Sequence, residues 1–146
     1  MKLVRNIITI DGPSGVGKGT LAFSLAEKLN WNVLDSGLLY RLIGYLSLEE
    51  RVETIHEIVL FLEKSKIQLL TNFEEGICEI KLNNKVLGKE LRNENIASRA
   101  SELAKEEEIR NAIIKIQRSA YDPKKGLIAD GRDMGTIIFP EAVLKI

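Results

Sequence analysis

This sequence has very little cysteine and no excess of either sign of charge. Among 146 residues there is one cysteine, Cys78. A single cysteine excludes an intramolecular disulfide framework and is typical of a protein from a reducing compartment. The 21 Lys and Arg residues balance the 21 Asp and Glu residues, so the chain has no overall field that would attract nucleic acid or a membrane surface.

Long apolar runs are also missing. No run approaches the roughly 20 residues of a transmembrane helix, and the first residues lead into a strand-like run without the apolar stretch of a signal peptide. No internal repeat or low-complexity linker occurs. A hydrophobic content of 45% and a charged content of 29% are ordinary for a globular protein. We therefore expect a cytoplasmic protein with one domain over residues 1–146.

The first third of the sequence predicts an α/β unit. Residues 6–11 (NIITID) form a β-branched run that ends at Gly-Pro-Ser-Gly, which is typical of a buried strand entering a turn. Residues 18–29 have helical spacing, and residues 31–35 (WNVLD) predict a second strand. Strand, helix and strand in this order indicate a right-handed parallel crossover. The apolar face of the helix is predicted from Leu21, Leu25, Ala26 and Leu29, with Asn30 as the stop.

The spacing of apolar residues changes in the middle of the sequence. A helix is predicted over residues 49–64, with Val52, Ile55, Ile58, Val59 and Leu62 on one face. A small β-meander follows near residues 66–92, and then two helical stretches and two further core strands. The meander strands are predicted at residues 67–71, 77–82 and 85–87, the helices at 95–105 and 106–121, and the core strands at 127–130 and 142–146.

The sequence stops inside the last predicted strand. A parallel strand of such a sheet is normally followed by a helix that covers it. We therefore expect the chain to be incomplete at its C-terminus.

A glycine-rich segment, GPSGVGKGT at residues 12–20, lies between the first strand and the first helix. Glycines let successive backbone N–H groups surround an anion, and the helix presents its positive end to the same phosphates. Lys18 would reach the β- and γ-phosphates of ATP, and the Thr20 hydroxyl would meet Mg²⁺, although Gly19 rather than Ser or Thr follows the lysine. A plain glycine-rich turn is the alternative. The predicted phosphate-binding residues are Gly12, Pro13, Ser14, Gly15, Val16, Gly17, Lys18, Gly19 and Thr20.

Polar residues follow two of the predicted strands. Asp35 and Asp130 end strands at the edge where ligands bind in open α/β sheets, and Asp130 can reach the water shell of a metal beside the loop. Gly131 lets the chain turn close to the phosphates, and Arg132 can pair with an acceptor phosphate. In the alternative interpretation, Asp35 and Asp130 only cap helices or turns, and Ser36 is only an N-cap.

Three segments together resemble bacterial cytidylate kinases, a branch of the P-loop nucleoside-monophosphate kinases. They are GPSGVGKGT, DSGLLYR at residues 35–41, and IADGRDMGTIIFPEA at residues 128–142, and the resemblance extends along the whole chain, including the β insert. It implies a doubly wound parallel sheet with flanking helices and a small antiparallel insert. It also implies transfer of the ATP γ-phosphoryl group to CMP or dCMP, with Mg²⁺, and a monophosphate-binding region at about residues 37–122.

The resemblance also implies roles for individual residues. Arg41 and Arg132 would hold the CMP phosphate, while Ser101, Arg110 and Asp133 would face the base and Asp35 and Ser36 would complete the acceptor site. The exocyclic amine of cytosine donates hydrogen bonds, which suits the Asp133 carboxylate. Uracil has a carbonyl there and would be repelled.

The implied partners are ATP and CMP or dCMP, without nucleic acid or membrane, and the protein is expected to be a monomer. Lys18 and Arg132 are the predicted catalytic residues, and no general base is required, because the acceptor phosphate oxygen is already a nucleophile. Two alternatives remain open. One is a kinase for another small acceptor, such as shikimate or uridylate, and the other is a nucleotide-binding module without transferase activity.

Overall fold

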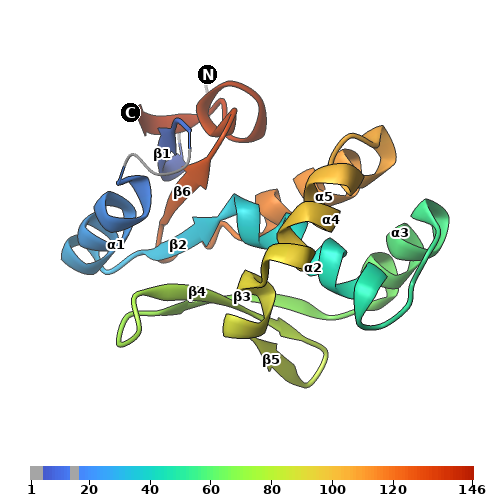
Figure 1. The fold of residues 1–146 in the computed structure, drawn as a ribbon. Coiled ribbons are helices and arrows are strands. Elements are labelled where there is room, and N and C mark those ends of the chain that lie inside the picture. The colour runs from blue at the N-terminus through green and yellow to red at the C-terminus, as the bar shows by residue number, and fades with distance from the viewer. Residues whose placement is uncertain (1–4, 14–16) are drawn as a thin grey trace. The chain divides into compact units, whose positions relative to one another are not determined.

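The computed structural model describes residues 5–13 and 17–146, and these fold into two compact units (Figure 1). The mixed α/β architecture predicted from the sequence is confirmed. The first unit takes its described residues from Met1–Ser36, Leu70–Cys78 and Gln117–Ile146, and the second consists of Gly37–Leu69 and Glu79–Ile116.

The first unit is built on a parallel sheet. Its strands are β1 (Arg5–Asp11), β2 (Asn32–Asp35), β6 (Leu127–Gly131) and β7 (Ala142–Lys145). Their order across the sheet is β2-β6-β1-β7, so that β6 lies between the first two strands of the sequence. Asp11 is opposite Gly131, and Asp35 is opposite Asp130. The carboxyl ends of β1, β2 and β6 therefore meet at one edge of the sheet.

The two central strands are buried on both faces. In β1 the side chains of Ile7 and Thr9 are fully buried, and in β6 those of Ile128 and Ala129 are fully buried. Burial on both faces is typical of a parallel sheet and explains why the middle of each strand is mostly apolar. The core of this unit thus lies directly behind the strand ends that carry the polar residues.

Helix α1 (Lys18–Leu29) has the bounds that the sequence predicted, and it packs on β6, β2 and β1. The predicted apolar face was only partly right. Ala22 and Ala26 are buried, whereas Leu21 and Leu29 are 40% and 43% exposed. The small alanine side chains let the helix approach the sheet closely, and the buried stripe is therefore centred on them rather than on the leucines. Asn30 ends the helix in the left-handed conformation, with φ 57°.

Helices make up most of the second unit. They are α2 (Ser36–Leu48), α3 (Ile55–Lys64), the short η1 (Lys89–Arg92), α4 (Glu94–Leu103) and α5 (Glu107–Ser119), with Ser36 and the last residues of α5 belonging to the first unit. Helix α2 crosses α4 at close range. A Cβ atom on Gly44 would lie 2.5 Å from the Ile96 carbonyl oxygen and 3.1 Å from the Ala100 nitrogen. Only glycine allows this approach without a shift of one helix.

The predicted start of α3 was wrong. A helix was expected from Glu49, but α2 runs to Leu48 and α3 begins only at Ile55. Thr54 sets this start, because its Oγ1 atom accepts a hydrogen bond from the backbone N–H of Glu57 at 3.1 Å. Ile58 and Leu62 are buried, as the predicted face requires.

The β-meander predicted near residues 66–92 is confirmed. Its strands are β3 (Ile67–Asn72), β4 (Ile77–Leu82) and β5 (Lys85–Leu87), in that order across the sheet. Strands β4 and β5 are antiparallel, with Ile80 opposite Leu87. Alternate side chains of β4 are buried, which is the pattern of a sheet with one face on the core.

Candidate active site

The described part of the predicted phosphate-binding loop consists of Gly12 and Pro13, the N-cap residue Gly17, and the first three residues of α1. The backbone N–H of Gly12 donates to the carbonyl of Gly131 at 3.3 Å, which ties the end of β1 to the end of β6. Gly17 has a φ of 83°, a left-handed conformation that favours glycine, immediately before the helix. Pro13, Gly19 and Thr20 are exposed, and the predicted loop residues Ser14, Gly15 and Val16 lie outside the described residues.

The first turn of α1 is suited to an anion. Gly17 provides no side-chain cap, and the first turn contains no acidic residue. The positive end of the helix dipole is therefore not neutralised by the helix itself. Apart from the backbone of its own helix, no atom of the described residues lies within 4 Å of the position that a Cβ atom on Gly19 would occupy, so their packing does not require glycine there.

Lys18 and Asp130 are in direct contact at the carboxyl edge of the sheet. The Nζ atom of Lys18 lies 2.9 Å from Oδ1 of Asp130 and also donates to the carbonyl of Gly131 at 3.3 Å. Both side chains are 14% exposed, so the ion pair is largely shielded from water. The structure thus brings together Lys18, which the sequence analysis assigned to the loop, and Asp130, which it placed at a strand end beside the loop.

The donor atoms near the loop fit a magnesium ion that is held mainly by phosphates. The described residues contain no group of three or more His, Cys, Asp and Glu side chains that could hold a metal by themselves. Mg²⁺ usually binds through one or two carboxylates, with waters and substrate phosphates as the other ligands. The Asp130 carboxylate and the Thr20 hydroxyl, both oxygen donors, match that requirement.

Ser36 and Gly131 are in tight contact beside Asp35. Ser36 is 6% exposed, and its Oγ atom lies 2.0 Å from the position that a Cβ atom on Gly131 would occupy. Gly131 is therefore required by the close approach of Ser36. This contact fixes the start of α2 against the end of β6.

Arg132 and Asp133 follow Gly131 and are both exposed. Asp133 has a φ of 57° and a ψ of 23°, and it precedes a short π-helix, η2 (Met134–Ile138), which the sequence did not predict. Neither side chain makes a hydrogen bond or ion pair with another of the described residues. Both are thus available to a ligand at the edge of the sheet.

The other predicted acceptor residues belong to the second unit. Arg41 is half-buried on α2, and Ser101 is exposed on α4. Arg110, on α5, donates from Nη1 to the carbonyls of Ala104 at 3.2 Å and Lys105 at 2.6 Å. In this structure Arg110 therefore satisfies free carbonyls at the end of α4, a structural contact that the sequence did not predict.

Arg110 also acts electrostatically on α2. Burial raises the pKa of the Tyr40 phenol, and the positive charge of Arg110 partly opposes this shift. Tyr40 directly precedes Arg41 in the sequence. The charge of Arg110 thus acts on Tyr40, the residue of α2 that precedes a predicted phosphate ligand.

Comparison with known proteins identifies the family. The family model for cytidylate kinase matches residues 8–146. The chain belongs to the cytidylate kinase family. It is 40% identical over 146 residues to the cytidylate kinases of Sodalis glossinidius (strain morsitans) and Pectobacterium atrosepticum, and all of this chain is covered in both matches. A cytidylate kinase of Yersinia pestis is similar at the same identity.

The chain spans about 64% of the length of the first two relatives and 63% of the third. The match therefore includes the loop, both strand-end segments and the β insert, but not the whole of each relative. No helix among the described residues has the length and apolar character needed to cross a membrane.

Sequence reasoning missed Arg118, which holds the far end of η2. Its Nη2 atom lies 3.0 Å from Oε1 of Glu141, its Nη1 atom donates to the carbonyl of Ile138, and its guanidinium lies 5.7 Å from the ring centroid of Phe139. The end of α5 that carries Arg118 and the η2 segment both belong to the first unit. No local pattern identifies this residue, because Arg118 lies in an ordinary amphipathic stretch and its partners are about 20 residues away.

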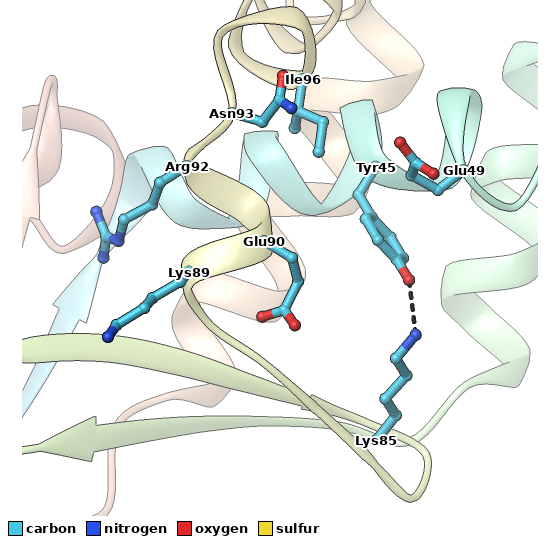
Figure 2. Close-up of a pocket in the computed structure, with 8 residues that line it drawn as sticks. All are labelled: Tyr45, Glu49, Lys85, Lys89, Glu90, Arg92, Asn93 and Ile96. Carbon is cyan, nitrogen blue, oxygen red and sulfur yellow. Dashed lines mark hydrogen bonds between the residues drawn. The ribbon is translucent and has the colours of Figure 1, made fainter.

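A pocket of about 480 Å³ lies in the second unit (Figure 2), and its lining includes none of the acceptor residues implied by the resemblance to cytidylate kinases. The Nζ atom of Lys85 donates to the Tyr45 hydroxyl at 2.9 Å, which raises the pKa of Lys85. The carboxylate of Glu90 accepts the Gly88 backbone N–H, which lowers the pKa of Glu90. The charged groups of Lys85 and Glu90 thus bind other groups of the second unit. The lining residues are Tyr45, Glu49, Lys85, Lys89, Glu90, Arg92, Asn93 and Ile96.

Proposed function

We propose that the protein transfers the γ-phosphoryl group of ATP to CMP or dCMP, yielding the nucleoside diphosphate and ADP. The observation that carries this proposal is the contact of Lys18 with Asp130, at the uncapped start of α1, in a chain of the cytidylate kinase family. A lysine at the entrance of an anion-binding helix, beside a carboxylate that suits Mg²⁺, is the arrangement that phosphoryl transfer requires.

The donor side acts by charge and position. The backbone N–H groups of the loop and the first turn of α1 would bind the β- and γ-phosphates, and Lys18 would neutralise the charge that develops between them. Mg²⁺, held by the ATP phosphates with Asp130 and Thr20 directly or through water, would supply further neutralisation of phosphate charge. Because such groups are preorganised, they need little rearrangement as the reaction proceeds.

The acceptor side brings the nucleophile into line. An oxygen of the CMP phosphate attacks the γ-phosphorus, and the bond between that phosphorus and the β–γ bridging oxygen breaks, leaving ADP. Arg41 and Arg132 would hold the acceptor phosphate, with Asp35 and Ser36 beside them. Ser101, Arg110 and Asp133 would bind the base, so that the region of about residues 37–122 carries much of the acceptor site.

The choice of cytosine follows from the chemistry of one carboxylate. Asp133 is exposed at the edge of the sheet and carries an acceptor that suits the exocyclic amine of cytosine. With uracil the same carboxylate would face a carbonyl lone pair. Selection would therefore rest on repulsion of UMP as much as on attraction of CMP.

The setting of the enzyme is part of the same proposal. We infer a cytoplasmic monomer that uses ATP and CMP or dCMP and has no nucleic-acid or membrane partner. The sequence contains one cysteine, Cys78, which is buried, and such sparse cysteine usage suits a reducing compartment.

A coupled assay of ADP formation by the full-length protein tests the proposed reaction. We expect ADP release from ATP and Mg²⁺ to depend on added CMP or dCMP, with a much lower kcat/KM for UMP and none for shikimate. Equal or greater activity with UMP or shikimate would identify a different kinase. Nucleotide binding without ADP release for any acceptor would favour a non-catalytic P-loop module.

A further inference from the structure

Asp11 connects the two halves of the candidate site. It is the last residue of β1 and directly precedes Gly12, the first residue of the phosphate-binding loop. Its Oδ1 atom accepts the backbone N–H of Met134 at 2.7 Å, and its Oδ2 atom accepts that of Gly135 at 2.9 Å. These are the first two residues of η2, more than 120 positions along the chain. One carboxylate thus joins the donor loop to the segment that carries Arg132 and Asp133.

These two hydrogen bonds replace a cap that would normally come from the neighbouring residue. The first N–H groups of a helix have no partner within it, and an aspartate at the N-cap position usually accepts one of them. Asp133 occupies that position before η2 but makes no side-chain cap. Its left-handed backbone, with φ 57°, differs from the extended conformation that N-cap residues normally adopt. Because Asp11 caps η2, the Asp133 carboxylate is not used for this purpose.

The rest of η2 is also fixed within the first unit. A Cβ atom on Gly135 would lie 2.8 Å from Oγ1 of Thr9, so the start of η2 packs tightly on β1. At the other end, Arg118 donates to the carbonyl of Ile138. These two contacts do not involve Asp11 and would still hold η2 if the Asp11 hydrogen bonds were lost. We therefore expect a change at Asp11 to act mainly on the residues just before Met134.

We propose that Asp11 is a positioning residue for the acceptor nucleotide. It holds Arg132 and Asp133 in place relative to the start of the phosphate-binding loop, and by capping η2 it leaves the Asp133 carboxylate available for the base. This role rests on the proposed function, because it assigns the two residues to the acceptor. Asp11 itself touches neither substrate in this account.

Substitution of Asp11 in the full-length protein tests the role. Asp11→Ala removes both acceptors, whereas Asp11→Asn is isosteric and keeps one. We expect Asp11→Ala to raise KM for CMP by roughly tenfold to a hundredfold, the size expected when reacting groups are misplaced, and to narrow the CMP preference over UMP. Asp11→Asn should have a smaller effect. KM for ATP should change less than about twofold in both variants, because the loop phosphate contacts are made by other residues.

Thr54→Ala is the matched control. It removes a side-chain cap of the same kind, the 3.1 Å contact with the Glu57 N–H at the start of α3 in the second unit. We expect this variant to lower Tm without changing KM for CMP or the CMP preference. Amide hydrogen exchange at Met134 and Gly135 should accelerate in the Asp11 variants and remain at the wild-type rate in Thr54→Ala.

A double-mutant cycle separates positioning from simple stability. If Asp11 acts through Asp133, then adding Asp11→Ala to Asp133→Ala should produce little further loss of the CMP preference. Independent, additive losses would contradict the proposal. So would Asp11 variants that lower Tm as Thr54→Ala does but keep the wild-type KM for CMP. If Asp11→Ala does not fold, Asp11→Asn decides on the same criteria.

The wild-type arm distinguishes failure of this inference from failure of the proposed function. A wild-type enzyme that phosphorylates CMP, with Asp11 variants equal to it, overturns only the role of Asp11. A wild-type protein that releases no ADP with CMP overturns the proposed function and this role together.

Discussion

Lys18 Nζ lies 2.9 Å from Asp130 Oδ1, which joins the first residue of α1 to the carboxyl end of β6. Gly131, next to Asp130, accepts a second hydrogen bond from the same ammonium group. The lysine is therefore held over the edge of the sheet rather than extended into solvent. On the proposed function, the two groups at this point have complementary tasks, because the ammonium binds phosphate and the carboxylate faces the cation.

We predict that Lys18→Met lowers kcat by at least about 10²–10³-fold, the size of the loss when a charge-stabilising group is removed from a site of this kind. The circular dichroism spectrum should remain that of the wild type, because the methionine side chain is similar in length to that of lysine and lacks only its charge. Steady-state ADP formation measures the effect. Lys28→Met removes a cation from the last turn of the same helix and should retain normal turnover. Near wild-type activity of Lys18→Met would contradict the assignment of Lys18.

Asp133→Ala is expected to narrow the preference for CMP over UMP. A good hydrogen-bonded contact to a base edge contributes about 1–3 kcal/mol, or roughly 5–150-fold in discrimination. The ratio of kcat/KM for the two nucleotides is the measurement, because selectivity resides in that ratio. Asp133→Asn offers both a donor and an acceptor, so it should improve UMP relative to Asp133→Ala. If the ratio stays at the wild-type value in both variants, Asp133 does not select the base.

Gly131→Ala should destabilise the first unit. The added Cβ atom would lie 2.0 Å from Oγ and 2.9 Å from Cβ of Ser36, and overpacking of this kind costs about 1–3 kcal/mol. Urea unfolding gives the change in the free energy of unfolding. Ser36→Gly removes both close atoms, so Gly131→Ala should cost much less in the Ser36→Gly background. An equal cost in both backgrounds would show that the contact is not the cause.

Gly44→Ala should destabilise the second unit although alanine favours helices. Helix propensity alone would stabilise the variant by up to about 1 kcal/mol. The new methyl group would lie 2.5 Å from the Ile96 carbonyl oxygen, and the resulting strain of about 1–3 kcal/mol outweighs that gain. Thermal unfolding measures the net effect. Gly19→Ala adds a methyl group to α1 that, apart from the backbone of its own helix, would have no atom of the described residues within 4 Å, and it should not lower Tm. A Gly44→Ala protein as stable as the wild type would refute the close crossing of α2 and α4.

The elements with strong local signals could be predicted from the sequence. Helix α1 has the predicted bounds because the glycines before it and Asn30 after it are local signals for the ends of a helix. The strands of the β insert were predicted equally well, because clear turns at residues 73–76 and 83–84 separate them. The start of α3 was missed because Thr54, rather than the first residue with helical spacing, decides where that helix begins.

The buried face of α1 could not be read from spacing alone. Hydrophobicity favoured Leu21 and Leu29 as buried residues. The residues of α1 that are buried are instead Ala22 and Ala26, whose small side chains let the helix pack closely on the sheet. Which face of a helix is buried depends on the shape of the surface beneath it, and a single sequence does not contain that shape. The tertiary contact overrides the local pattern.

The supporting residues of the candidate site were missed for a related reason. Asp11 binds η2 from more than 120 residues away, and Arg118 binds the other end from about 20 residues away. Neither residue belongs to a pattern that its neighbours in the sequence reveal. On the proposed function, the residues of the loop and strand ends are recognisable because a bound phosphate would dictate their spacing, whereas their supports can come from any part of the fold.

Transfer of labelled phosphate measures the central claim most directly. The full-length protein would be incubated with Mg²⁺, ATP labelled in the γ-phosphate, and either CMP or UMP, and the products separated by chromatography. The account predicts that label moves from ATP into CDP, that little enters UDP, and that Lys18→Met yields almost none of either. Label that remains in ATP, or that appears as inorganic phosphate whether or not CMP is present, would contradict it.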